Sequence, residues 1–156
     1  MVNVSRIQIM ILLQNKQLIP IPGDLEQNTQ ILLKDLGYVD FDISIVCVDE
    51  QEMQHYNKQF RDKDKPTDIL SFPFHSTLKA GDRIDAQTDD EKNLGDIILC
   101  PQFIENDLER WEQTYQERMK TLLVHGVCHL LGYDHIEDSD YEVMKREEER
   151  LRALLD

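Results

Sequence analysis

The chain has 156 residues, with 17 lysines and arginines against 31 aspartates and glutamates, and a formal net charge of −14. That length suits one domain, which we place over residues 1–156, and 40% hydrophobic with 31% charged residues exclude a wholly disordered chain and a membrane protein. The negative balance argues against a nucleic-acid binder that relies on a broad basic face, although it leaves room for a small basic site.

The N-terminal apolar stretch, residues 7–13, is interrupted by Gln8 and is too short to cross a bilayer of about 30 Å. It lacks a basic start and a small-residue cleavage site, so it does not resemble a secretion signal. The odd number of cysteines, far apart at Cys47, Cys100 and Cys128, favours reduced thiols packed in the core. We therefore expect a cytoplasmic protein without a membrane partner.

The apolar pattern predicts about four strands. Apolar residues recur at every second position in residues 7–13 and 41–47, and both runs are rich in β-branched side chains. Residues 69–74 and 96–100 are short apolar runs of the same character. Between the third and fourth strands, the polar and acidic segment 75–93 is expected to be a solvated loop, with a mobile flap over a site as the alternative.

About five helices are expected between and after these strands. Each has an apolar stripe at helical spacing, and Gly37 and the capping-box pair Asp49 and Glu52 mark two of the boundaries. The expected helices are residues 25–36, a segment opening at Asp49, residues 101–115, residues 119–132 and the tail from Ser139. The predicted fold class is α+β, with these helices packed on a small mixed sheet.

Three of the five histidines fall within eleven residues, in the string His125-Gly-Val-Cys-His129-Leu-Leu-Gly-Tyr-Asp-His135. Positions four apart on a helix point the same way, so His125 and His129 can bind one ion. Gly132 allows the chain to turn back with a positive φ, so that His135 approaches from another side. Three imidazoles with one open position are typical of a catalytic zinc, and the spacing matches that of metzincin proteases.

Two features of this string leave alternatives open. The general-base glutamate that metzincins place after the first histidine is absent, because Gly126 occupies that position, so peptide hydrolysis by that route loses its base. Asp134 can serve as a hydrogen-bond partner to a ligand histidine, as a base, or only as a cap of the turn. Cys128 is favoured as a packing residue over a fourth ligand or a redox-sensitive thiol.

A second informative segment runs from Asn57 to Pro73. Between Lys58 and Lys65 it holds four cations against two acids, a basic island in an acidic chain. The lysines are most simply solvated, whereas Arg61 could bind a phosphate if it points toward the metal. Thr67 and Asp68 predict a turn before the third strand, with Asp68 bonding nearby backbone amides.

The chain resembles the YbeY family of bacterial rRNA-maturation endoribonucleases. The resemblance rests on three segments, which occur in the family's order and spacing: residues 57–72, Leu94-Gly95-Asp96-Ile97, and the histidine string. It extends from about Phe41 to His135. Cys128 departs from the family, which commonly has leucine there. Beyond His135, no motif is matched.

The resemblance implies a single-strand-specific, zinc-dependent endoribonuclease, acting in 16S rRNA 3′-end maturation and ribosome quality control. It also implies one Zn²⁺ per chain on His125, His129 and His135, with Arg61 contributing to cleavage. Single-stranded RNA or an rRNA precursor, and ribosomal particles or a ribosomal protein, are the implied partners; DNA is not expected. Two alternatives are a metzincin-like protease or amide hydrolase, and a non-catalytic ribosome-associated factor whose metal is structural.

Overall fold

The computed structural model describes residues 7–11, of which only the backbone is considered, and residues 19–156. Within these ranges the strands are β1 (Ile7–Ile11), β2 (Asp42–Cys47), β3 (Ile69–Pro73) and β4 (Asn93–Leu99). The helices are α1 (Leu25–Leu36), α2 (Glu50–Arg61), α3 (Pro101–Asn106), α4 (Leu108–Trp111), α5 (Tyr115–Leu130) and α6 (Asp138–Ala153), with a 3₁₀ turn, η1 (Asp89–Glu91). The last residues of the strand expected over 7–13 lie outside the described residues.

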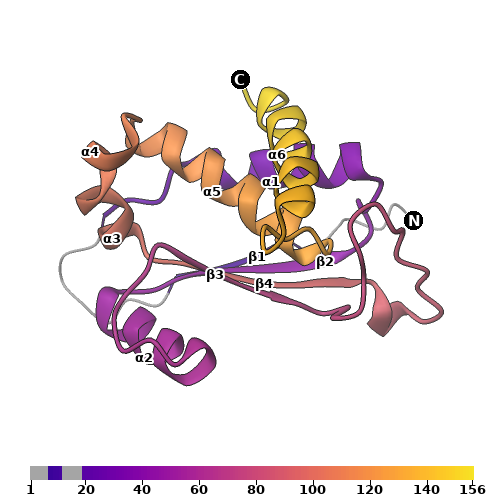
Figure 1. Ribbon diagram of the computed structural model, residues 1–156, viewed down its shortest axis with the longest axis horizontal. Coiled ribbons are helices and arrows are strands. Elements are labelled where there is room, and N and C mark those ends of the chain that lie inside the picture. The colour runs from indigo at the N-terminus through magenta and orange to yellow at the C-terminus, as the bar shows by residue number, and fades with distance from the viewer. Residues whose placement is uncertain (1–6, 12–18) are drawn as a thin grey trace.

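The strands form one mixed sheet in the order β1-β2-β4-β3. β1 and β2 are parallel, β2 and β4 are parallel, and β3 runs antiparallel to β4. Helices α1, α5 and α6 lie on one side of this sheet and α2 lies on the other, as Figure 1 shows. The prediction of an α+β fold with helices packed on a small mixed sheet is confirmed.

Both faces of the central strands are covered, which explains their nearly continuous apolar runs. In β4, Ile97 and Leu99 belong to the main core beneath α1 and α5, whereas Ile98 turns toward α2. On that second face, Met53 of α2 packs with Ile98 and Leu70. The sheet therefore holds α5 and α2 in fixed positions on its two faces.

One expected helix is divided. Residues 101–115 carry a continuous apolar stripe, yet the chain leaves helical geometry at Asp107 and adopts a positive φ of 52° at Glu112. Thr114 then caps a new helix, because its hydroxyl accepts from the Glu117 N–H and the Glu117 carboxylate accepts from the Thr114 N–H. As a result, Tyr115 opens α5, four residues before the expected start.

The segment between β3 and β4 is tied to the C-terminal end of α1. The Arg83 guanidinium donates to the carbonyls of Leu36 and Gly37, at 2.9 and 3.0 Å, and the Ile84 N–H donates to the Tyr38 hydroxyl. Ile84 is itself buried. This long connection is thus anchored in the core near its centre, while most of its acidic residues face solvent.

Two other expectations concern the whole chain. The three cysteines are free and buried, as predicted for packing residues. No helix within residues 19–156 is long and apolar enough to span a bilayer.

Candidate metal centre

Helix α5 presents two of the three histidines. Its buried face packs on β3 and β4, and His125 and His129 lie one turn apart on a half-buried face of the helix. The chain then leaves the helix through Gly132, which has a φ of +89°. A Cβ at Gly132 would lie 2.3 Å from the Leu78 carbonyl oxygen, so only glycine fits this turn.

The turn brings His135 back against the helix, as the spacing predicts. One ring nitrogen of each histidine lies within 4.8 Å of those of the other two. The Nε2 atoms of His125 and His129 are 3.0 Å apart. Nitrogens bound to one tetrahedral zinc at about 2.0–2.1 Å would be about 3.3 Å apart, so this donor set fits such an ion.

The other ring nitrogen of each helical histidine is held by a partner. His125 Nδ1 lies 2.9 Å from Glu148 Oε2 on α6, and His129 Nδ1 lies 2.9 Å from the carbonyl oxygen of Tyr133. Each acceptor selects the tautomer with its proton on Nδ1, which leaves the Nε2 lone pair free. Both Nε2 atoms are thereby prepared to bind a cation.

The electrostatic environment keeps His129 neutral. Burial lowers the pKa of His129 to about 4, and the charges of His125, His135 and Arg61 act in the same direction. The bond to the Tyr133 carbonyl opposes this shift without cancelling it. At neutral pH the ring is unprotonated, which metal binding requires.

Gly126 faces the sheet. A Cβ built there would lie 2.9 Å from Ile97 Cδ1 and 3.0 Å from Ile69 Cδ1. A glutamate at this position would therefore have to enter the core between α5 and the sheet. The close approach of helix and sheet gives a structural reason why the metzincin base is missing.

Glu148 is the functional residue that the sequence alone did not reveal. It is separated from His125 by 23 positions and carries no motif, and only the packing of α6 across α5 brings the two together (Figure 1). Asp134, the carboxylate nearest in sequence, instead accepts a 3.3 Å bond from the Ile136 N–H. Asp134 was predicted to be a partner of a ligand histidine, a base, or a cap of the turn, and this contact supports the cap.

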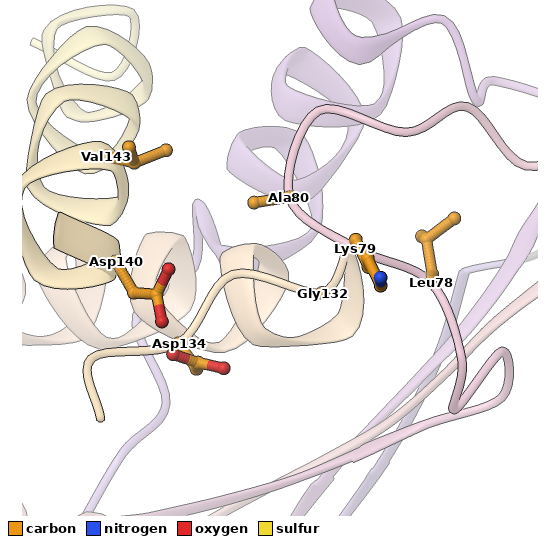
Figure 2. A pocket seen from close by; sticks show the side chains of 7 residues that line it. All are labelled: Leu78, Lys79, Ala80, Gly132, Asp134, Asp140 and Val143. Atoms are coloured by element: carbon orange, nitrogen blue, oxygen red, sulfur yellow. The ribbon is translucent and has the colours of Figure 1, made fainter. Parts of the chain in front are cut away.

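A cavity of about 450 Å³ lies behind the turn, as Figure 2 shows. Asp134 and Asp140 line one side of it, and Leu78 and Lys79 come from the long β3–β4 connection. Gly132 lies between the two groups. This connection thus packs against the glycine turn that leads to His135.

Arg61, the last residue of α2, is exposed, and its charge acts on His129. The following loop folds back on α2, because the buried Asn57 amide donates 2.8 Å to the Lys65 carbonyl. Lys58 pairs with Asp64 at 3.6 Å in an exposed contact. The expected solvation of the lysines in this segment is confirmed by their exposure.

Asp68 contacts the backbone as predicted, accepting 2.8 Å from the Ile69 N–H. It also forms an ion pair that the sequence did not predict, at 3.2 Å from the guanidinium of Arg118. Arg118 is 8% exposed, so this largely buried pair links the residue before β3 to the N-terminal half of α5. The two residues are 50 positions apart, a separation at which no local pattern operates.

The fold and the site define a class: a small α+β protein whose three histidines, two on a helix and one after a glycine turn, can hold a metal ion. A family profile described as "Endoribonuclease YbeY" matches residues 14–156. The chain belongs to the YbeY family, as the resemblance in the sequence suggested.

Individual relatives agree with this assignment. The human protein named "Endoribonuclease YbeY" is 38% identical over 142 residues, which cover 90% of this chain and 83% of the human protein. One of the same name from Neisseria meningitidis is 42% identical over 115 residues, covering 74% of this chain and 64% of that protein. A Thermotoga maritima protein of known solution structure has a similar fold, with a TM-score of 0.55 and 26% identity, covering 95% of this chain and 90% of the other.

Proposed function

We propose that this protein is a zinc-dependent endoribonuclease that cleaves single-stranded RNA, with one ion held by His125, His129 and His135. The observation that carries the proposal is the convergence of three imidazoles, two of them with Nδ1 already bonded and Nε2 free. Membership of a family whose relatives are named endoribonucleases supports RNA as the substrate.

The chemistry follows from the donor set. When bound, a zinc ion polarises a phosphoryl oxygen and lowers the pKa of a bound water toward about 7. Glu148 keeps the His125 ring oriented, and the Tyr133 carbonyl does the same for His129. Three protein ligands leave a coordination position open, as in catalytic rather than structural zinc sites.

Arg61 is the residue we assign to the phosphate. Its exposed side chain is within electrostatic range of His129, and a guanidinium fork binds phosphate oxygens in pairs. In this position it stabilises negative charge that develops on the scissile phosphate. Arg61 would act on substrate, while the histidines hold the metal.

The biological setting is proposed from the family resemblance. We place the activity in the cytoplasm, in 3′-end maturation of 16S rRNA and in ribosome quality control. Ribosomal particles or a ribosomal protein are the partners that would deliver the RNA, because a chain of charge −14 has little affinity of its own for a polyanion.

One cleavage assay tests the proposal. Zinc-loaded wild-type protein and Arg61→Ala are incubated with single-stranded, duplex and rRNA-precursor substrates, and zinc content is measured in parallel. We expect cleavage of single-stranded segments, and a loss of about 100-fold in Arg61→Ala at unchanged zinc content. Arg146→Ala, which removes an exposed arginine of α6, is the matched control and should cleave normally.

The same preparation separates the alternatives. Turnover of a peptide library without RNA cleavage would indicate an amide hydrolase. Association with ribosomal particles that is weakened by Arg61→Ala, while RNA stays intact in every sample, would indicate a binding factor with a structural metal. Either result would overturn the endoribonuclease assignment.

A further inference from the structure

A second cavity, of about 360 Å³, opens directly beside the metal site. His125 and Glu148 line one side of it, so the cavity shares a wall with the proposed zinc centre. The other lining residues come from the start of β3 and the residue before it, from α4 and from the first half of α5. Its volume is at the small end of the range of about 300–1,000 Å³ that is typical of small-molecule pockets.

An aromatic residue and a guanidinium form the far wall of this cavity. Trp111 is 39% exposed, and the guanidinium carbons of Arg118 and Arg110 lie 3.7 and 5.1 Å from its ring centroid. The indole N–H donates 3.0 Å to Asp107, and Arg118 is bound to Asp68. The ring and the guanidinium are therefore held in place before any ligand arrives.

The charges around the cavity disfavour a phosphate. Arg118 is the lining cation, and Asp68 already neutralises it at 3.2 Å. Glu148 adds a further carboxylate, whereas the Thr121 hydroxyl already donates to the Glu117 carbonyl and accepts from the Gln113 amide. The acceptors that the wall offers are thus the carboxylates of Asp68 and Glu148, which suit a neutral group with N–H donors.

A flat, neutral, N–H-bearing group next to a phosphate-cleaving metal is a nucleobase. Single-stranded RNA is recognised by stacking its bases on aromatic side chains and arginine planes and by bonds to their edges. We propose that this cavity receives the base of the nucleotide beside the scissile phosphate, packed against the exposed part of Trp111 and the guanidinium plane of Arg118, with the Asp68 and Glu148 carboxylates as acceptors for its N–H donors. The proposal deepens the endoribonuclease assignment and rests on it for the reaction, but base binding can be measured separately.

Trp111 is the chain's one tryptophan, so its indole N–H gives a single ¹⁵N–¹H resonance that reports on the cavity. Zinc-loaded protein is titrated with adenosine 5′-monophosphate, cytidine 5′-monophosphate and ribose 5-phosphate. All three carry the same sugar and phosphate, and only the first two carry a base. We expect saturable shifts with the nucleotides, and an affinity for ribose 5-phosphate that is about tenfold or more weaker.

Equal shifts with all three compounds, or none with the nucleotides, would overturn the proposal. This result does not depend on cleavage, so it judges the cavity even if the protein cuts no RNA. An absence of cleavage with normal nucleotide shifts would count against the proposed function and in favour of the base-binding cavity.

A second arm connects the cavity to cleavage. An oligoribonucleotide with one preferred cut is compared with versions that lack the base at a single nucleotide on either side of that cut. In wild-type protein, removal of one of these bases should lower kcat/KM about tenfold. In Trp111→Ala, the kcat/KM values for the intact oligonucleotide and for this base-lacking version should become nearly equal. Trp111→Phe should restore part of the difference.

Zinc content and the unfolding midpoint of each variant show whether the fold is kept. Phe74→Ala is the matched control, because Phe74 is a 49% exposed aromatic residue outside the cavity. In Phe74→Ala, removal of the base should lower kcat/KM as much as it does in wild-type protein. Retention of the full base effect in folded Trp111→Ala would contradict the proposal.

Discussion

At the scale of single residues, the site depends on contacts that hold rings rather than on the rings alone. Three histidines at this spacing were predictable as a group, because helical periodicity and a glycine place them together. The hydrogen-bond partners of these rings were not predictable from the sequence. Glu148 reaches His125 only through the packing of α6, and the Tyr133 carbonyl reaches His129 only because the turn closes as it does.

Replacing the partner of His125 should weaken metal binding. In Glu148→Gln the ring loses a carboxylate at 2.9 Å, and with it orientation and basicity. We expect zinc affinity to fall about 10- to 100-fold, measured by competition with a chelator of known affinity. Glu142→Gln removes an exposed carboxylate from the same helix and serves as the control. Identical affinities in the two variants would show that Glu148 has no part in the site.

At the scale of elements, the site depends on how closely α5 lies on the sheet. Gly126 lies close against Ile97 and Ile69 on the buried face of the helix, whereas His125 and His129 lie on its half-buried face. The helix thus combines a core face and a ligand face within one turn. A shift of α5 away from the sheet would move His125 and Arg118 together relative to Asp68.

This packing predicts a stability effect. Gly126→Ala places a Cβ 2.9 Å from Ile97 Cδ1, and side chains in the core must move to admit it. We expect a loss of about 1–3 kcal/mol in the free energy of unfolding, measured by urea denaturation. Gly23→Ala is the control, because nothing lies within 4 Å of the added Cβ. An unchanged or raised midpoint in Gly126→Ala would mean that the interface is looser than described.

The elements also show where sequence patterns stop being informative. Alternating apolar residues located β2, and a short apolar run located β3, each to within one residue of the observed bounds. The stripe over residues 101–115 predicted one helix, but it is shared by two short helices and the start of α5. Periodicity does not reveal such breaks, whereas the capping box at Thr114 and Glu117 would have marked the boundary.

At the scale of the whole molecule, the charge of −14 decides how RNA can be bound. The exposed segment from Lys58 to Lys65 holds four cations against two acids, a local excess of positive charge in an acidic chain. RNA affinity must therefore come from the metal, from Arg61 and from this segment, or from delivery by a partner. The base-binding cavity would add selectivity without adding positive charge.

Binding to free single-stranded RNA should accordingly be weak and sensitive to salt. With about four phosphate contacts, the slope of log K against log salt should be near −3 for a single strand. Lys63→Ala combined with Lys65→Ala should make this slope shallower by about 1.4, while Lys34→Ala on α1 leaves it unchanged. Fluorescence anisotropy of a labelled oligonucleotide measures both. Tight binding that hardly varies with salt would contradict this description.

The central claim, that the three histidines hold the ion on which cleavage depends, is tested by metal reconstitution. Zinc is removed with a chelator and returned in measured amounts to wild-type protein and to His129→Ala, and cleavage of a single-stranded RNA is followed. We predict no cleavage without metal, recovery in proportion to zinc up to one ion per chain, and neither zinc binding nor cleavage in His129→Ala. Full cleavage by metal-free protein or by His129→Ala would contradict the claim.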